Sequence, residues 1–263
     1  HRPIGLGVQG LADLFTLLRI PLDSQEAIRL NFYIFEAMYF AALDASNELA
    51  QEKGTYESFQ GSPASKGLLQ FDLVEREGLA RATEQVGGTM INIFFERKQD
   101  WNSLKQRIIT IGLRNSLVVA PMPTASTSYL MKNSPCFEPN NSNIYKRAND
   151  VGEFVVVNEL LINDLISLGL WSNDMKNKIM LANGSVQDIV DIPKNVRILY
   201  KTTWDMSLKA IINLAISRSP FVDQSQSMNL FIERPSPKIL TQIHFYTWRR
   251  GLKTGSYYIH SRP

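Results

Sequence analysis

Short apolar runs that suit β-strands alternate along this chain with longer segments that suit α-helices. Residues 115–120 (Asn-Ser-Leu-Val-Val-Ala) form a run typical of a buried strand, and residues 154–157 and 228–232 are also rich in strand-forming residues. Strands that alternate with helices are typical of α/β proteins with a mainly parallel sheet. We therefore expect an α/β fold.

The helical segments are marked by apolar spacing and by their ends. Asp23 and Glu26 have the spacing of a capping box and open a long helix that stops at Gly54. A second predicted helix, residues 102–111, ends at Gly112. Further helices are predicted over residues 159–168, 174–181, 193–217 (interrupted) and 237–250, followed by an extended segment over residues 256–260.

Charge and cysteine content argue against several classes of protein. The 263 residues carry a formal net charge of +3, and the basic residues are scattered, so no nucleic-acid-binding surface is expected. No apolar run is long enough to cross a membrane. The one cysteine, Cys136, excludes an internal disulfide and metal sites built on several thiolates. We expect a cytoplasmic protein, and a start at His1 predicts a piece of a longer chain.

A glycine motif near the N-terminus has two interpretations. Gly5, Gly7 and Gly10 fit the G-x-G-x-x-G pattern of dinucleotide-binding proteins and precede a predicted helix. The motif needs a preceding strand, for which only residues 1–4 are available, and an acidic residue after a second strand, whereas Asp23 lies at a helix start. Glycines that allow tight backbone packing are therefore favoured over a nicotinamide site.

Residues 74–97 differ in character from the rest of the chain. Their first part is charged, Gly87 and Gly88 interrupt it, and residues 90–95 form a strand-like apolar run. The lack of periodicity predicts an exposed loop that packs poorly. We interpret the stretch as an atypical insertion or loop, or as a fault in the coding sequence.

Several blocks of residues form a long ordered pattern. Trp101-Asn-Ser-Leu104, Gly112-Leu-Arg-Asn115, Val119-Ala120 and Pro123 follow one another at spacings that resemble the signature of the large, catalytic subunit of class I ribonucleotide reductases. Further blocks are similar to the eukaryotic and viral members of that family: residues 1–11 (HRPIGLGVQGL), 120–127 (APMPTAST), 142–145 (SNIY), 221–229 (FVDQSQSMN) and 245–263 (FYTWRRGLKTGSYYIHSRP). The resemblance covers nearly the whole chain except residues 74–97.

The resemblance implies that residues 1–263 are the C-terminal portion of the catalytic domain, part of a ten-stranded α/β barrel and mainly its second half. It also implies reduction of ribonucleoside diphosphates at C2′ through a protein thiyl radical, for DNA precursor synthesis. The family's catalytic cysteine, its redox-active cysteine pairs and its binding regions for ATP and deoxynucleotide effectors are expected outside this chain. Cys136 matches none of these cysteines and is expected to be a small buried or loop residue.

The same resemblance implies the partners of the protein. They are a ribonucleoside diphosphate substrate, a small subunit whose di-iron centre supplies the radical, a second large subunit in a homodimer, and thioredoxin or glutaredoxin as reductant. No cofactor or metal is implied within this chain, and no direct contact with nucleic acid or membrane is expected. Two alternatives stay open: a non-catalytic remnant that acts as a binding or scaffold protein, and an unrelated nucleotide-binding oxidoreductase.

A run of small hydroxyl residues follows the predicted strand at residues 115–120. Hydroxyls and unpaired backbone N–H groups at a helix start can bind anionic oxygens, although the same residues can simply cap the helix. The residues alone support both interpretations about equally, and the resemblance favours the first. It implies that the substrate diphosphate binds at Pro123, Thr124, Ala125, Ser126 and Thr127, with Pro123 holding the turn rigid.

Two adjacent tyrosines, Tyr257 and Tyr258, lie in the final extended segment. On a regular strand adjacent side chains point to opposite faces, which predicts one buried and one exposed ring. The resemblance implies instead that both tyrosines transfer a radical toward the catalytic cysteine, which requires a departure from strand geometry. The rings should then be close and near-parallel, and should face the same cavity as the hydroxyl run.

Other polar residues carry simpler expectations. Asp223 and the polar residues that follow it predict a buried hydrogen-bond network rather than a catalytic group. Glu138 is given no role, although it lies in a segment that resembles the family's substrate loop; the residues before it, 134–137, depart from the family's usual ones. Four basic residues near one helix end are interpreted as solvated charges: His244, Arg249, Arg250 and Lys253.

Overall fold

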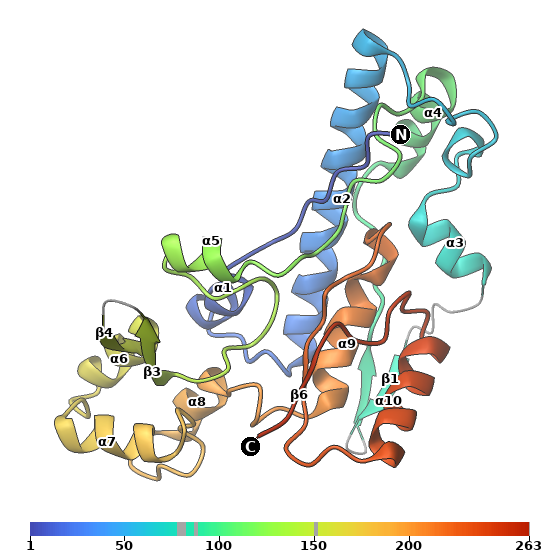
Figure 1. The fold of residues 1–263 in the computed structure, drawn as a ribbon. Helices are drawn as coiled ribbons and strands as arrows, with labels where there is room; N and C mark the ends of the chain where they lie inside the picture. The colour runs from blue at the N-terminus through green and yellow to red at the C-terminus, as the bar shows by residue number, and fades with distance from the viewer. Residues whose placement is uncertain (78–82, 87–88, 150–151, 263) are drawn as a thin grey trace.

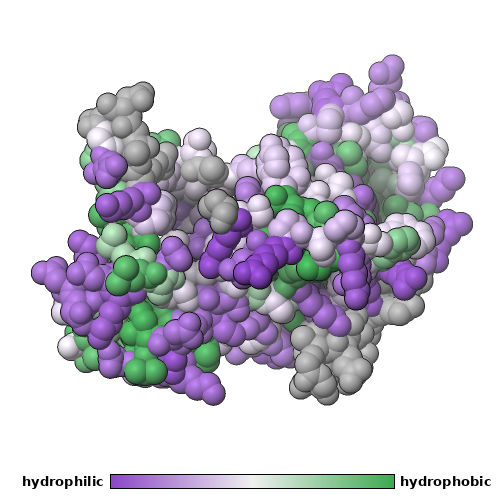
Figure 2. Space-filling view, turned by 60° about the horizontal axis from the view of Figure 1, so that its bottom comes forward, coloured by the Kyte–Doolittle hydropathy of each residue, from purple (hydrophilic) through white to green (hydrophobic). Residues whose placement is uncertain are grey.

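The computed structural model describes residues 1–77, 83–86, 89–149 and 152–262, and these residues form two lobes (Figure 1). The smaller lobe comprises residues 140–203, and its two ends meet where the Thr203 N–H donates to the Asn140 carbonyl at 2.9 Å. It has a hydrophobic core of its own, separate from the core of the larger lobe. Both lobes expose a mixture of hydrophilic and hydrophobic side chains on the face seen in Figure 2.

The long helix α2 (Gln25–Lys53) runs through the larger lobe and packs against α9 (Leu208–Arg218). Gly54 ends the helix, as predicted, with a positive φ of 76°. The predicted cap at Asp23 is wrong: Ser24 is the N-cap, and its Oγ accepts a hydrogen bond from the Ala27 N–H. Serine suits this position because its short side chain reaches an otherwise unpaired amide of the first turn.

The other helices of the larger lobe are α1 (Leu11–Leu17), α3 (Gln70–Arg76), α4 (Trp101–Ile111), α5 (Ala125–Leu130) and α10 (Pro237–Arg249). The smaller lobe holds α6 (Glu159–Ser167), α7 (Asn173–Leu181), α8 (Lys194–Arg197) and the hairpin of β3 (Ile144–Asn149) and β4 (Gly152–Val157). Short 3-10 helices lie at Ala64–Lys66, Ile198–Tyr200 and Ser219–Phe221. The predicted helices are confirmed, including the interruption within residues 193–217.

Four extended segments of the larger lobe pair side by side in the parallel sense. Residues 4–6 bond to residues 117–120 through a parallel bridge between Leu6 and Val119. Residues 119–121 accept hydrogen bonds from residues 224–227, and β5 (Leu230–Phe231) pairs in parallel with β6 (Ile259–His260). The predicted parallel pairing is therefore found in these short segments, whereas the two regular hairpins, residues 83–86 with 89–92 and residues 144–149 with 152–157, are antiparallel, so a mainly parallel sheet is not confirmed.

The predicted strand at residues 115–120 is extended but is not a regular strand. The N–H groups of Val118 and Val119 both donate to the carboxylate of Asp223, at 2.9 Å each. A side chain thus takes the place of backbone carbonyls at these two amides, which explains the interrupted ladder. The polar network expected at Asp223 is confirmed in this form.

The glycines of the N-terminal motif allow two backbones to lie close together. A Cβ atom at Gly7 would lie 3.3 Å from the Cα of Pro121, and one at Gly5 would lie 3.3 Å from the Cβ of Ala120. Gly10 has a φ of 76° at the N-cap of α1, a conformation that glycine adopts at little cost. Tight packing, rather than a nicotinamide site, accounts for the motif.

The prediction that residues 74–97 are exposed and poorly packed is wrong at both ends of the stretch. Val74 is buried on α3, and Ile93 is completely buried in the main core. Phe95 packs edge-on against Phe32, with ring centroids 5.5 Å apart. Between these ends, β1 (Thr83–Val86) and β2 (Thr89–Asn92) form an antiparallel hairpin. Gly87 and Gly88 lie outside the described residues, and the insertion itself remains a prediction.

Candidate active site

The hydroxyl run lies at the junction between the extended segment at residues 117–121 and helix α5. Thr124 is the N-cap of α5, but its side chain does not cap the helix. Its Oγ1 instead accepts a hydrogen bond from the Cys136 N–H at 2.6 Å. The alternative that Thr124 serves only as a cap is therefore not supported.

The hydroxyls of Ser126 and Thr127 are exposed on the first turn of α5. Thr127 Oγ1 donates to Gln9 Oε1 at 3.0 Å, and Gln9 lies three residues after Leu6, the last residue of the segment that pairs with residues 117–120. Two neighbouring segments of the parallel ladder thus end at the same place. Pro123 is exposed just before the run, and its ring fixes the backbone there.

Tyr257 and Tyr258 have their rings in contact, with centroids 4.5 Å apart. Their planes are inclined at 67°, so the rings meet edge to face and the expected near-parallel arrangement is wrong. Both rings are exposed, at 54% and 57%, which also excludes the strand alternation of one buried and one exposed ring. Regular strand geometry begins only at Ile259, which allows the two side chains to meet.

Glu138 is a buried carboxylate that the sequence interpretation left without a role. It is 7% exposed, and it accepts hydrogen bonds from both nitrogens of Asn229: the backbone N–H at 2.6 Å and Nδ2 at 3.1 Å. Burial raises the pKa of Glu138, and the bonds from Asn229 oppose that rise. No local pattern in the sequence indicates this burial, because the bonding partner Asn229 lies 91 positions away.

Arg218, at the C-terminus of α9, is the second buried charge that sequence interpretation missed. It is 1% exposed; its Nε donates to Gln226 Oε1 at 2.7 Å and its Nη1 to Asn31 Oδ1 at 3.0 Å. Its guanidinium carbon lies 4.2 Å from the ring centroid of Phe137. Burial lowers the pKa of Arg218 to about 9, and the charge of Glu138 opposes this shift.

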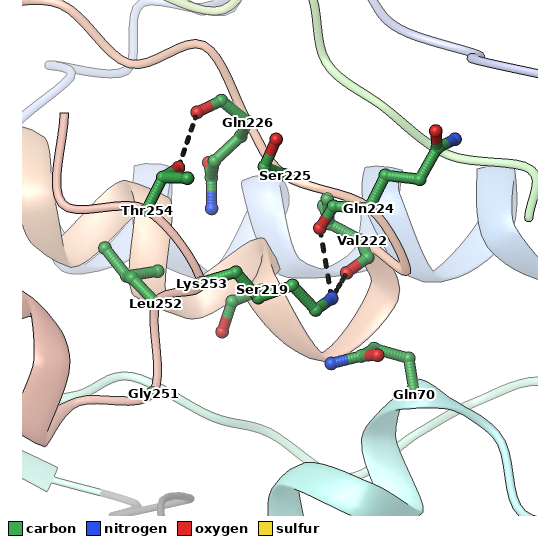
Figure 3. A pocket seen from close by; sticks show the side chains of 10 residues that line it. All are labelled: Gln70, Ser219, Val222, Gln224, Ser225, Gln226, Gly251, Leu252, Lys253 and Thr254. Carbon is green, nitrogen blue, oxygen red and sulfur yellow. Dashed lines mark hydrogen bonds between the residues drawn. The ribbon is translucent and has the colours of Figure 1, made fainter. Parts of the chain in front are cut away.

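The basic residues on α10 and just after it are only partly as expected. His244 and Arg249 are exposed, whereas Arg250 is buried, so its interpretation as a solvated charge is wrong. Lys253 Nζ donates to the carbonyls of Val222 and Gln224, at 2.7 and 3.0 Å (Figure 3). These bonds border a cavity of about 10 Å³, which is room for about one water molecule. Lys253 therefore stabilises the backbone beside Asp223.

Cys136 is buried and has a φ of 43°. Burial raises the pKa of its thiol to about 11, so the thiol stays protonated and unreactive near neutral pH. Within the described ranges, no group of three or more His, Cys, Asp or Glu side chains could hold a metal ion. No helix in that part of the chain is long and apolar enough to cross a membrane.

Comparisons with known proteins agree with the resemblance. The model of the family described as "Ribonucleotide reductase, barrel domain" matches residues 1–258. The ribonucleoside-diphosphate reductase large subunits of Trypanosoma brucei brucei and Dictyostelium discoideum are 50% and 51% identical over the whole chain, which covers only 31% and 28% of their lengths.

A solved structure gives the same result. The alpha subunit of the class Id ribonucleotide reductase of Actinobacillus ureae superposes with a TM-score of 0.71 at 25% identity, over the whole chain and 39% of that subunit. The mixture of helices and parallel extended segments described above fits part of an α/β barrel. The chain therefore belongs to the ribonucleotide reductase barrel-domain family and forms a portion of that α/β barrel.

Proposed function

We propose that this chain is a portion of the catalytic barrel domain of a ribonucleoside-diphosphate reductase large subunit. The whole protein would reduce ribonucleoside diphosphates to 2′-deoxyribonucleoside diphosphates. The observation that carries the proposal is the position of the hydroxyl run, at a strand-to-helix junction in a chain whose curated relatives bear this name. In this proposal residues 1–263 act as one portion of the domain.

The substrate diphosphate binds to the residues from Pro123 to Thr127. Thr124 Oγ1 accepts from the Cys136 amide, which leaves its own hydrogen available for a phosphate oxygen. The exposed hydroxyls of Ser126 and Thr127 offer two further donors, and the backbone N–H groups of Ala125 and Ser126 have no carbonyl within the helix to bond. Several neutral donors around a dianionic group provide the charge-assisted bonds that such a ligand needs.

Tyr257 and Tyr258 transfer the radical. A small subunit supplies the oxidant, and each tyrosine in turn gives up an electron together with its phenolic proton, so that no net charge builds up on the ring. The 4.5 Å separation of the ring centroids supports direct exchange between the two. The remaining partners in this proposal are a second large subunit and thioredoxin or glutaredoxin as reductant.

The cysteine that reacts with substrate is not Cys136 in this proposal. A buried thiol with a pKa of about 11 lacks the exposure and the thiolate character of a reactive cysteine. We therefore expect the 263-residue chain alone to be inactive.

The proposal is tested with the full-length subunit, its small subunit and a thiol reductant, by chromatographic detection of deoxynucleotide formed from CDP. Product is expected from the full-length protein and not from the 263-residue chain. Absence of product from a correctly assembled full-length enzyme would instead support a non-catalytic remnant.

A further inference from the structure

Three consecutive residues, Cys136, Phe137 and Glu138, lie between the hydroxyl run and the tyrosine pair. At one end, the Cys136 N–H donates to Thr124 Oγ1 at 2.6 Å. At the other end, Glu138 accepts from the backbone N–H and Nδ2 of Asn229. The segment is therefore bonded to residues on both sides.

Asn229 lies between the two residues whose backbones hold the tyrosines. The carbonyl of Met228 accepts from the Tyr257 N–H at 2.6 Å, and the N–H of Leu230 donates to the Tyr258 carbonyl at 2.9 Å. A displacement of Asn229 along its strand would therefore move the backbone of both tyrosines. Glu138 accepts hydrogen bonds from the backbone N–H and from the side chain of Asn229, so it fixes the position of Asn229 directly.

Phe137, the middle residue of the segment, packs against Arg218. The Arg218 guanidinium lies 4.2 Å from the Phe137 ring centroid and is itself fixed by Gln226 and Asn31. Burial lowers the pKa of Arg218, and the electrostatic effects of Cys136 and Glu138 oppose that shift. Burying charges is costly unless they are hydrogen-bonded, and the side chains of Glu138 and Arg218 both meet that condition here.

We infer that Glu138 is a positioning residue that couples the substrate diphosphate loop to the tyrosine pair through Asn229. It touches neither substrate nor the reacting atoms in this account. The inference rests on the proposed function, since it takes the roles of Thr124 and of the tyrosines from it. Occupancy of the loop is transmitted through Cys136 to Glu138, and from there to the strand beside Tyr257 and Tyr258.

The test uses the full-length subunit with 3-fluorotyrosine at position 258, followed by ¹⁹F NMR with and without saturating CDP. In the parent protein, CDP shifts the resonance. In Glu138→Ala this CDP-dependent shift is lost, and turnover with the small subunit falls roughly tenfold to hundredfold, because small misplacements of reacting groups have effects of this size.

Glu138→Gln separates positioning from charge. A glutamine can keep both bonds to Asn229 if the Asn229 side-chain amide flips, so that its oxygen accepts from the glutamine nitrogen. This variant should therefore retain most of the CDP-dependent shift and most of the catalytic rate. If Glu138→Gln loses the CDP-dependent shift and the turnover as completely as Glu138→Ala, the charge of Glu138 is required and not its hydrogen bonds. That result would overturn the inference. If Glu138→Ala does not fold, Asn229→Ala is measured in its place; it removes the side-chain bond and keeps the backbone bond to Glu138, so a reduced CDP-dependent shift is expected, and an unchanged shift would overturn the inference.

Asp72→Ala is the matched control. Asp72 also accepts from one backbone N–H, that of Leu69, and from one side-chain nitrogen, that of Lys105. It lies on α3, outside the proposed site, so its loss affects stability but leaves the CDP-dependent shift in place. A shift that survives in Glu138→Ala, or a parent that binds CDP without a shift, overturns the coupling and leaves the proposed function standing. A parent that does not bind CDP overturns both.

Discussion

Removal of the hydroxyls at Ser126 and Thr127 should weaken diphosphate binding by unequal amounts. A hydrogen bond to a charged group contributes about 1.5–3 kcal/mol, so Ser126→Ala should raise the Kd for a ribonucleoside diphosphate by roughly 10- to 150-fold. Thr127 must first give up its 3.0 Å bond to Gln9. That exchange leaves a net of about 0.5–1.5 kcal/mol, which corresponds to roughly a 2- to 10-fold change for Thr127→Ala.

Both substitutions lie on an exposed turn and should change the free energy of unfolding by no more than about 0.5 kcal/mol. Isothermal titration of the full-length subunit with CDP measures the Kd, and thermal unfolding measures the stability. Thr110→Ala is the control, because Thr110 is an exposed helical hydroxyl bonded only to the Gln106 carbonyl of α4. An unchanged Kd in both site variants would refute the phosphate role of this loop.

Three further predictions follow from backbone strain, burial and charge. Gly184→Ala should destabilise the smaller lobe by more than about 2 kcal/mol in urea unfolding, since φ is 83° and a Cβ would lie 2.8 Å from the Asn143 nitrogen. Gly169→Ala, with φ at 69° and open space around it, should cost only about 1–2 kcal/mol; equal losses would contradict the steric argument. Cys136, with a pKa of about 11, should have roughly one-thousandth of its thiol ionised at pH 8, so mass spectrometry should find it alkylated by iodoacetamide only after unfolding. Burial raises the pKa of Asp223, so the folded state binds the carboxyl proton of Asp223 more tightly than the unfolded state does. The contribution of this proton to the free energy of unfolding is lost as pH rises through the folded-state pKa. The free energy of unfolding of the parent should therefore fall relative to that of Asp223→Asn as the pH rises above about 4, and a parent that instead gains stability relative to the variant would contradict the shift.

Much of the fold could be predicted from the sequence because local signals decide it. Gly54 and Gly112 end α2 and α4 as predicted, since a glycine in the left-handed or otherwise open region stops a helix wherever it occurs. The alternation of strand and helix segments likewise gave the correct class. These features depend on residues close together in the chain.

Features that depend on distant residues could not be predicted in the same way. The strand at residues 115–120 is irregular because Asp223, more than a hundred positions away, bonds its amides. Ile93 is buried because helix α2 and the segments around it offer an apolar surface that no local pattern reveals. The composition of residues 74–97 alone predicts a loop, because the distant residues that bury Val74 and Ile93 are not part of that stretch.

The candidate site also combines features that depend on neighbouring residues with features that depend on distant ones. The hydroxyl run was visible as a run of residues, and the tyrosine pair as two neighbours. Glu138 and Arg218 were not visible, because their role depends on burial and on Asn229, Gln226 and Asn31, which come from other parts of the chain. An isolated acidic or basic residue in a sequence does not indicate whether it will be buried.

The radical-transfer role of Tyr258 offers the most direct test of the whole account. Tyr258→Phe keeps the ring and removes only the phenolic O–H, and the ring is more than half exposed, so stability should change by no more than about 0.5 kcal/mol. CDP binding should be retained, because the diphosphate binds at residues 123–127. The measurement is the rate of deoxynucleotide formation by the full-length variant with its small subunit and a thiol reductant. Our account predicts a rate indistinguishable from that of a reaction without enzyme, and a folded, CDP-binding variant with normal turnover would contradict it.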